Sequence, residues 1–477
     1  MGRVVRPRAR ARHARIRCVL GDVPMGTDSP QYLRPASHHP LRHPSRINTR
    51  SGRPLCGVAG QADRGRPQAS LPHRGDDRDV DPVGEVWRHR PAQERSMSIR
   101  PFRIDVPQSI IDDLHRRLDA TIWPQTLPGA EWDYGTDVDE LRALVDHWRH
   151  RYDWRRVEAE LNLLPQFVVT VDGMDVHCIH ARGAGVPRQA LVLTHGWPST
   201  FYELHRLVGP LTDPAAHGAD ADAAFDIVIP SLPGYGWSSP PTTRGFGANQ
   251  VADLWVELMA ELGYERFGSH GGDWGSAVTT ALGARHPDRL TGIHVNMLAP
   301  PVDVASLTSE QRAWWDRVLA YRDREWGYVH LQRTKPQTAS FGLTDSPVGL
   351  AAWILEKWWR WSDIEEESGR RELSRRYTMD ELITTIMIYW VTRTIGSSMR
   401  MYYETFSAMN RIPQPPRVGV PFGMAAFKEM NRAPRELAEP HYDIRRWTVI
   451  DDGGHFPGLE NPAALAHEIR EFFRDMS

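Results

Sequence analysis

The apolar positions of this chain first become regular shortly after residue 100. Ile110, Leu114 and Leu118 follow helical spacing, and a second apolar stripe runs from residue 137 to residue 149. Trp-Pro and Pro-Gly pairs separate the two stripes and interrupt any continuous helix. We therefore expect two amphipathic helices that supply packing surface and carry no catalytic group.

The apolar pattern then changes to a period of two. Residues 166–180 alternate on both sides of Asp172 and Gly173, and Asp-Gly between alternating runs is a hairpin signal. Helix-compatible segments then alternate with fuller apolar runs, which we interpret as buried strands at residues 190–194, 225–229, 264–270, 290–297, 417–421 and 447–451. Buried strands that alternate with helices predict an α/β fold, with a mostly parallel central sheet and helices on both faces.

A helical insertion interrupts this alternation at residues 301–409. It is rich in tryptophan, with indoles at Trp314, Trp315, Trp326, Trp353, Trp358, Trp359, Trp361 and Trp390. An insertion after the strand at residues 290–297 would lie at the carboxyl edge of the sheet, where α/β proteins bind ligands. Most of these indoles are expected in the core, and the others would line an apolar substrate pocket.

The first 96 residues follow neither period. They hold 19 Arg, no Lys and nine Asp or Glu, so their formal charge is +10, against −12 for the rest of the chain. A basic arm for nucleic acid and a disordered extension are both compatible with this composition, and disorder is the better fit. We favour a third interpretation, a reading frame extended upstream of Met97, because the scarcity of Lys indicates GC-rich coding DNA, which keeps such frames open.

The patterns divide the chain into five parts. We expect an extension at residues 1–96 and an N-terminal domain with the first strands at residues 97–185. The α/β core would follow in two parts, at residues 186–300 and 410–477, with a helical lid between them at residues 301–409.

Overall composition narrows the class of protein. The net charge of −2 exerts no general attraction for nucleic acid or an anionic membrane, so we expect neither partner. Cys18, Cys56 and Cys178 form neither a metal-binding spacing nor a disulfide framework, which favours a reducing, cytoplasmic compartment. The longest strongly apolar run, residues 382–391, is too short to span a bilayer, so no membrane anchor is expected.

The strongest chemical signal follows the apolar run at residues 264–270. Residues 271–275 read Gly-Gly-Asp-Trp-Gly and lead into a helix-compatible run. A nucleophile flanked by small residues between strand and helix is typical of a nucleophile elbow, with Gly271 and Gly275 at the crowded positions. Asp273 would then attack an electrophilic carbon and form an ester. The alternative is a glycine-rich turn with a solvated Asp.

Two other predicted strand ends carry motifs that would converge on the elbow. Residues 195–198, His-Gly-Trp-Pro, would direct backbone N–H groups toward the carboxyl edge of the sheet. The alternative is an ordinary Gly-Pro turn with no catalytic role. Residues 453–456, Gly-Gly-His-Phe, follow the last strand, so His455 would reach the elbow as a catalytic base. The chain order of nucleophile, acid and base supports this interpretation.

Together these motifs make residues 97–477 resemble the epoxide hydrolases of the α/β-hydrolase fold, specifically their microsomal-type branch. Residues 132–136, Trp-Asp-Tyr-Gly-Thr, look like part of that branch's N-terminal domain. The oxyanion, nucleophile and base motifs of the family match residues 195–198, 271–275 and 453–456. The resemblance implies that the backbone N–H groups of Trp197 and Trp274 form an oxyanion hole.

The resemblance also implies acid groups in the lid. Residues 327–336 look like part of the stretch that bears the first lid tyrosine, which is Tyr328 here. Residues 400–404, Arg-Met-Tyr-Tyr-Glu, look like the stretch that bears the second. Spacing within that stretch assigns Tyr402, with Tyr403 as the alternative.

The expected triad acid departs from the family pattern. The family has Val-Pro-Thr-Gly followed by Phe-Pro-x-Glu, whereas residues 420–430 lack the second proline and are one residue short before Glu429. Glu429 is the only carboxylate nearby, so we assign it the role of orienting His455. A displaced acid would slow ester hydrolysis more than ester formation.

The expected reaction is hydrolysis of an epoxide to a vicinal diol. Asp273 would attack a ring carbon while Tyr328 and Tyr402 protonate the oxygen, and His455 would then activate water to cleave the ester. The expected partners are a small apolar epoxide and water, no metal or organic cofactor is required, and a homodimer is compatible with the sequence. Haloalkane dehalogenation and a non-catalytic binding protein on the same fold are the alternatives, and Asp273 itself argues against a serine esterase.

Overall fold

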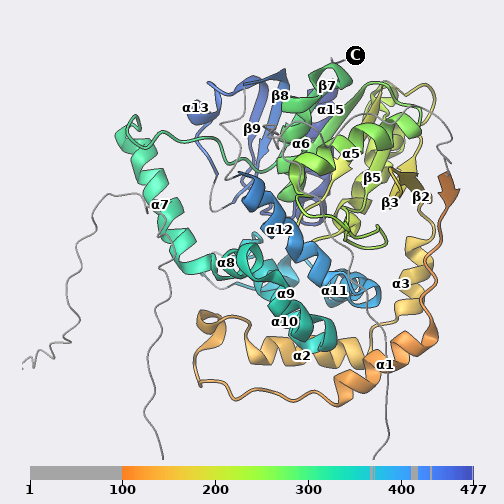
Figure 1. The fold of residues 1–477 in the computed structure, drawn as a ribbon, viewed down its shortest axis with the longest axis vertical. Coiled ribbons are helices and arrows are strands. Elements are labelled where there is room, and N and C mark those ends of the chain that lie inside the picture. Colours follow the sequence, from red (N-terminus) through yellow and green to blue (C-terminus); the bar gives the residue numbers. More distant parts are fainter. Residues whose placement is uncertain are drawn as a thin grey trace, which may run out of the picture. The chain divides into compact units, whose positions relative to one another are not determined.

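The structure is a computed structural model that describes residues 99–187, 189–365, 369, 371–409, 417–429, 432–474 and 476 (Figure 1). The Arg-rich segment at residues 1–96 lies outside the described residues, so the prediction that it is disordered is not tested by the structure. From residue 90 onward the chain forms one unit. The division of that unit at residues 185, 300 and 409 stays a prediction.

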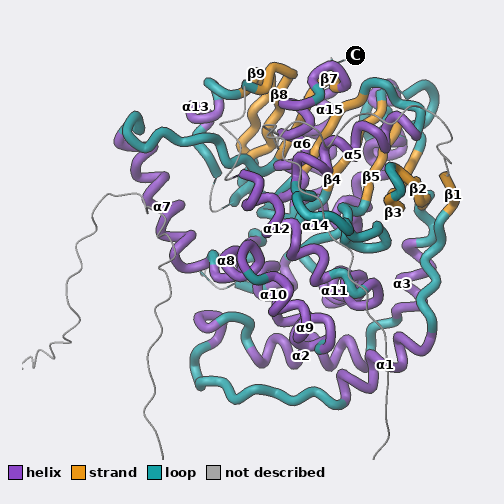
Figure 2. Tube along the Cα trace, viewed as in Figure 1, coloured by secondary structure: helices purple, strands orange, loops and turns teal. Residues whose placement is uncertain are grey.

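A nine-stranded sheet forms the centre of this unit, and Figure 2 shows its strands side by side. The strands are β1 (Ile99–Pro101), β2 (Gln166–Val171), β3 (Met174–Ala181), β4 (Ala190–Thr194), β5 (Asp226–Pro230), β6 (Phe267–Gly271), β7 (Leu290–Val295), β8 (Val418–Ala426) and β9 (Tyr442–Val449). Their spatial order is β1-β2-β3-β5-β4-β6-β7-β8-β9. The pairs from β5 to β9 are parallel, whereas β1, β2, β3 and β5 pair antiparallel. The predicted mostly parallel α/β sheet is confirmed.

The sequence pattern of the strands follows from their burial. Every residue of β4, β5, β6 and β7 is buried, which explains why these strands do not alternate between apolar and exposed polar residues. The predicted hairpin joins β2 to β3 through Asp172 and Gly173, whose φ angles are 48° and 76°. Two successive residues with positive φ make the tight turn that matches the twist of an antiparallel pair.

The last two strands are longer than the sequence pattern predicts. The predicted run at residues 417–421 is only the start of β8, which continues to Ala426. Pro421 does not end the strand, because it lies at a register shift in the ladder with β9. The end of β8 is therefore close in sequence to Glu429. Strand β9 begins at Tyr442, ahead of its predicted start, because an edge strand can carry polar residues.

Helices cover both faces of the sheet. Helix α5 (Ala248–Glu261) packs on α6 (Trp274–Arg285), and α6 contacts β4, β6, β7 and β8 on one face. On the other face, α15 (Pro462–Phe473) contacts β7, β8 and β9. Shorter helices of the core include the 3-10 helices η2 (Phe201–Leu207), η3 (Ala215–His217), η4 (Ala221–Ala223) and η5 (Pro287–Arg289), and α4 (Val208–Thr212), α13 (Arg435–Ala438) and α14 (Pro457–Glu460).

The predicted helical insertion follows β7 and forms a lid. Its helices are α7 (Ser309–Glu325), α8 (Gly327–Thr334), α9 (Pro336–Asp345), α10 (Pro347–Trp361), α11 (Met379–Thr392) and α12 (Ile395–Met409). Helices α8, α9 and α12 pack on one another, and α10 packs on α9 and α11. Local sequence sets the start of α11, because Thr378 and Glu381 form a reciprocal capping box.

The N-terminal helices pack against this lid. They are α1 (Gln108–Asp119), α2 (Val138–His150) and α3 (Trp154–Leu161). Helix α2 contacts α10 and α11, while β1 joins the edge of the sheet, so this segment touches both lid and core (Figure 1). The first two helices agree with the predicted stripes, whereas α3 is too short for the apolar pattern to predict. None of the described helices is both long and apolar enough to span a bilayer.

Candidate active site

The turn between β6 and α6 has the geometry of a nucleophile elbow. Asp273 sits between the strand and the helix with φ 50° and ψ −120°, a strained conformation for a residue with a side chain. A Cβ on Gly271 would lie 2.2 Å from the carbonyl carbon of Gly275, and one on Gly275 would lie 1.9 Å from the carbonyl oxygen of Thr194. Only glycine fits at these two positions, which agrees with the expectation from the sequence.

Backbone N–H groups of the loop after β4 and of the start of α6 hold the Asp273 carboxylate. The N–H of Trp197, in the loop after β4, donates to Oδ1 at 2.8 Å, and the N–H of Trp274 also hydrogen-bonds the carboxylate. Burial raises the pKa of Asp273, and attraction to His455 and the two backbone donors offset only part of that effect. The two residues predicted to form an oxyanion hole are thus both at the carboxylate.

The imidazole of His455 lies between two carboxylates. Its Nε2 is 3.7 Å from Oδ2 of Asp273, and its Nδ1 is 2.7 Å from Oε1 of Glu429. Burial lowers the pKa of His455, but attraction to Glu429, the hydrogen bond with it and the charge of Asp273 outweigh burial and raise the pKa to about 9. The shortened stretch before Glu429 therefore still brings its carboxylate to the imidazole.

Two phenols lie on the opposite side of the nucleophile from the sheet, in the lid. The ring of Tyr328 stacks on the indole of Trp197 with centroids 5.3 Å apart, and the ring of Tyr402 lies edge-on to Trp274 at 4.7 Å. The two phenol rings lie edge to face, with centroids 6.0 Å apart. Burial raises the pKa of both well above the ordinary range, so both stay protonated at neutral pH. Tyr403 is 42% exposed and points away from this group.

A cavity of about 180 Å³ opens onto most of the predicted site residues, although Tyr402 is not part of its wall. Asp273, Tyr328, Glu429 and His455 line it together with apolar residues of the lid and of residues 297–302. Four of the eight lid indoles contribute to its wall, namely Trp314, Trp315, Trp326 and Trp361. Others belong to the core, such as the fully buried Trp358 and Trp390. The lid tryptophans are thus divided between the core and the cavity wall, and the use of that cavity for substrate stays a prediction.

Sequence reasoning missed three carboxylates close to this site: Glu203 and Glu460, which are buried, and Asp363, which is partly buried. Glu203 accepts a hydrogen bond from the hydroxyl of Ser199, and its burial raises its pKa to about 7. Glu460 and Asp363 accept hydrogen bonds from backbone N–H groups around His455. Backbone donors leave no signature of residue type, so no motif could have indicated these roles.

Comparison with known proteins places this site in a family. The family "Epoxide hydrolase N terminus" matches residues 99–204, and the family "alpha/beta hydrolase fold" matches residues 189–362. Epoxide hydrolase 1 of Sus scrofa is 35% identical to this chain over 422 residues, which cover 82% of this chain and 92% of the relative.

Solved structures agree with the sequence matches. The crystal structure of juvenile hormone epoxide hydrolase from the silkworm Bombyx mori superimposes with a TM-score of 0.73 at 30% identity, covering 80% of this chain and 95% of that one. The epoxide hydrolase of Aspergillus niger gives a TM-score of 0.70 at 26% identity, covering 80% and 97%. The chain therefore belongs to the epoxide hydrolase family of the α/β-hydrolase fold and is an epoxide hydrolase.

Proposed function

We propose that this enzyme converts an epoxide to a vicinal diol through a covalent ester on Asp273. The observation that carries the proposal is the placement of the Asp273 carboxylate. Its Oδ1 accepts backbone hydrogen bonds, and its Oδ2 faces His455 and the cavity. One oxygen is thus held, while the other remains available to attack.

In the first step, Oδ2 of Asp273 attacks a carbon of the epoxide ring. The C–O bond of the ring breaks, and Tyr328 or Tyr402 donates a proton to the oxygen as its charge develops. An alkoxide is a poor leaving group, so a positioned acid lowers the barrier to ring opening. The two phenol rings lie edge to face with centroids 6.0 Å apart, and this proximity supports a shared role at a single oxygen.

In the second step, His455 takes a proton from water, and the resulting hydroxide attacks the carbonyl carbon of the ester. The negative charge then develops on Oδ1, which already accepts the N–H of Trp197, and the N–H of Trp274 lies at the same carboxylate. Each such donor contributes about 3 kcal/mol to the transition state. Collapse of the intermediate releases the diol with Oδ2, and the proton held by His455 neutralises the departing alkoxide. The carboxylic acid left on Asp273 then loses its proton, which restores the tyrosine that protonated the ring oxygen in the first step.

Formation of the ester also changes the protonation of the base. Asp273 loses its negative charge when its oxygen is alkylated, and that charge is one of the causes that raise the pKa of His455. The imidazole therefore becomes easier to deprotonate after ring opening than before it. The base is thus released for the step that requires it.

The cavity supports a class of substrate. Its small volume and its wall of indole rings favour compact apolar epoxides, because aromatic surfaces bind apolar groups and offer few polar partners. We propose aryl- and alkyl-substituted epoxides of modest size, with styrene oxide as a suitable probe.

A single turnover in ¹⁸O-labelled water tests the ester mechanism. The proposal expects the label in the Asp273 carboxylate after one turnover, with an unlabelled diol, because the diol oxygen comes from Oδ2. Label that appears directly in the diol would refute the ester. Asp273→Ala should yield no diol, and a matched panel of haloalkanes should yield no halide if the acid tyrosines define the reaction.

A further inference from the structure

The loop that leaves lid helix α10 contacts the loop that carries the base. The backbone N–H of His455 donates to the carbonyl oxygen of Trp361 over 3.1 Å, and the two rings lie 4.8 Å apart between centroids. Gly454 permits this approach, because a Cβ there would lie 2.7 Å from both the carbonyl oxygen of Trp361 and the backbone N of Asp363. The end of α10 therefore limits where the imidazole can lie.

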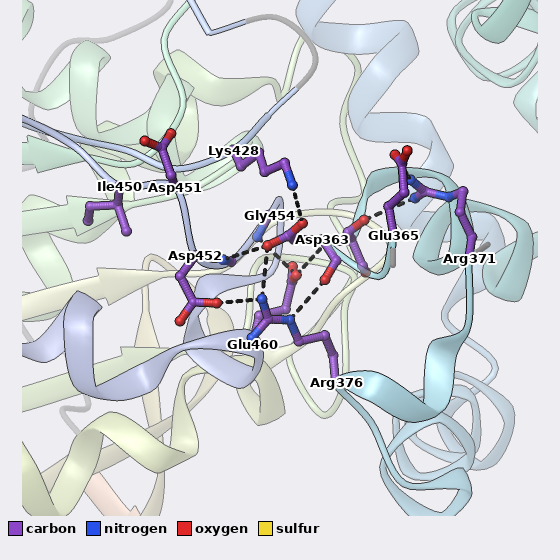
Figure 3. Close-up of polar contacts among 12 residues, drawn as sticks. Asp363, Glu365, Arg371, Arg376, Lys428, Ile450, Asp451, Asp452, Gly454 and Glu460 are labelled. Atoms are coloured by element: carbon purple, nitrogen blue, oxygen red, sulfur yellow. Dashed lines mark hydrogen bonds and ion pairs between the residues drawn. The ribbon is translucent and has the colours of Figure 1, made fainter. Parts of the chain in front are cut away.

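Glu460 joins the same two loops (Figure 3). Its buried carboxylate accepts backbone N–H groups from Gly454 at 2.9 Å, from Phe456 at 2.9 Å and from Asp363 at 2.8 Å. Gly454 and Phe456 flank His455 in the chain, so these bonds hold the peptide on both sides of the base. A buried carboxylate needs such donors, and moving either loop would break them.

Asp363 extends the connection to the triad acid, as Figure 3 shows. Its Oδ1 accepts from Nζ of Lys428 at 2.9 Å, while its Oδ2 accepts from Arg376 at 2.9 Å and from the N–H of Gly453 at 3.2 Å. Lys428 immediately precedes Glu429 in the chain. One carboxylate of the lid loop thus contacts both the strand end before Glu429 and the turn before the base.

The charge of Asp363 suits this position. Burial raises its pKa, but the hydrogen bonds from Lys428, Gly453 and Arg376 and the charge of Lys428 outweigh burial and lower it. The carboxylate is therefore ionised at neutral pH, where it can accept from all three donors.

The chain before Glu429 depends on such anchoring for a reason visible in its sequence. It lacks the proline of the family pattern and is one residue shorter, so no fixed φ angle sets its direction. The backbone N–H of Lys428 instead donates to the carbonyl oxygen of Gly453 at 3.0 Å, and the Arg432 side chain donates to the carbonyl oxygen of Phe427 at 2.9 Å.

We propose that Asp363, through Lys428 and Gly453, is a positioning residue that holds the Glu429–His455 pair against the ester of Asp273. This rests on the proposed function, because the orientation of the base matters only where the base activates water. Asp363 does not contact Asp273 or the lid tyrosines, so ring opening should not depend on it. Ester hydrolysis should, since a displacement of about 1 Å in such a site can cost about a hundredfold in rate.

Two variants test this assignment in the full-length enzyme with styrene oxide. Lys428→Met removes the ion pair but keeps the backbone bond, and Asp363→Asn replaces one acceptor oxygen by a donor. Rapid-quench mass spectrometry of single turnovers should show the ester forming at the wild-type rate and being hydrolysed about tenfold more slowly, so that it accumulates. Lys428→Arg retains the charge and should restore most of the hydrolysis rate.

A matched control separates positioning from general stability. Arg445→Met removes an exposed ion pair with Asp443 near the start of β9, away from the base loop, and should leave both steps unchanged. The Lys428 side chain is 54% exposed, so its ion pair adds little to the free energy of unfolding, and the melting temperature of Lys428→Met should not fall.

Several outcomes would overturn the assignment. Wild-type ester hydrolysis in Lys428→Met, or an equal loss of both steps, would show that the contact does not position the base. Lys428→Met decides alone if Asp363→Asn does not fold. If the wild-type and His455→Gln enzymes form no ester at all, the proposed function fails, which is a result distinct from failure of this assignment.

Discussion

The indole of Trp197 stacks on the phenol ring of Tyr328, with centroids 5.3 Å apart and planes within 7° of parallel. The backbone N–H of the same tryptophan donates to Oδ1 of Asp273. The ring of Tyr402 meets this indole edge-on at 5.7 Å. One residue therefore supports both the nucleophile and the proposed acids, so their relative positions cannot change independently.

Loss of the phenol oxygens should slow ring opening. Tyr328→Phe and Tyr402→Phe should each lower the rate of ester formation, and the double variant should lower it by about a hundredfold or more, since a positioned acid contributes that much. Each single variant keeps one donor and therefore partial activity. Rapid-quench measurement of ester formation with styrene oxide is the appropriate assay.

Tyr403→Phe is the matched control for these variants. Its side chain is exposed, and it neighbours Tyr402 on α12. Wild-type ester formation is expected in Tyr403→Phe, and stability should hold in all variants because the ring is retained. A folded double variant that opens the ring at the wild-type rate would refute the role of the tyrosines.

Removal of the base should separate the two chemical steps. His455→Gln should leave ring opening intact and stop ester hydrolysis, because only the second step requires a base. Mass spectrometry of the mixed sample should find Asp273 carrying the mass of one substrate. An inactive variant without that adduct would contradict the division of roles.

The elbow could be predicted because its determinants are local. Gly271, Asp273 and Gly275 fall within five residues, and the crowding that excludes a Cβ arises within the turn and against the neighbouring strand. The same locality explains why the hairpin at Asp172 and the buried strands could be predicted. Which of two adjacent helical residues faces the site is harder to predict. Tyr402 and Tyr403 have the same side chain, and only the packing of α12 buries one and exposes the other.

The neighbourhood of Glu429 shows where sequence reasoning stops. Strand β8 continues past Pro421 because its pairing with β9 shifts register there. This pairing involves two strands that are far from the elbow in the sequence, so no local pattern near the elbow predicts it. The contact of Glu429 with His455 then depends on the position of the loop around Asp363, which belongs to the lid. Such placement results from tertiary packing and from backbone donors, neither of which leaves a residue pattern.

The turn itself provides a prediction about stability. Gly275→Ala would bring a Cβ to 1.9 Å from the carbonyl oxygen of Thr194, so β4 and α6 would have to separate. Overpacking of this kind costs about 1–3 kcal/mol or more of the free energy of unfolding. Differential scanning calorimetry should show a lower melting temperature for Gly275→Ala. Gly342→Ala, in α9 with nothing within 4 Å of the added Cβ, is the control and should keep or raise the melting temperature, because alanine favours a helix over glycine.

The raised pKa of His455 determines how the rate of ester hydrolysis should change with pH. A base must be neutral to accept a proton, and the pKa of His455 is raised to about 9 while Asp273 is ionised. The rate of ester hydrolysis should therefore rise with pH as the imidazole loses its proton. Because the ester carries no charge on Asp273, one cause of the raised pKa is absent, and the midpoint of this rise should lie below about 9.

Ester formation should depend on pH differently. It requires ionised Asp273 and protonated phenols, and burial keeps the pKa of Tyr328 and Tyr402 well above the ordinary range. Ring opening should therefore vary little over the pH range in which hydrolysis rises. Single-turnover rates measured between about pH 6 and pH 10 resolve the two steps. A hydrolysis rate that falls with pH, while ester formation stays constant, would exclude His455 as the base.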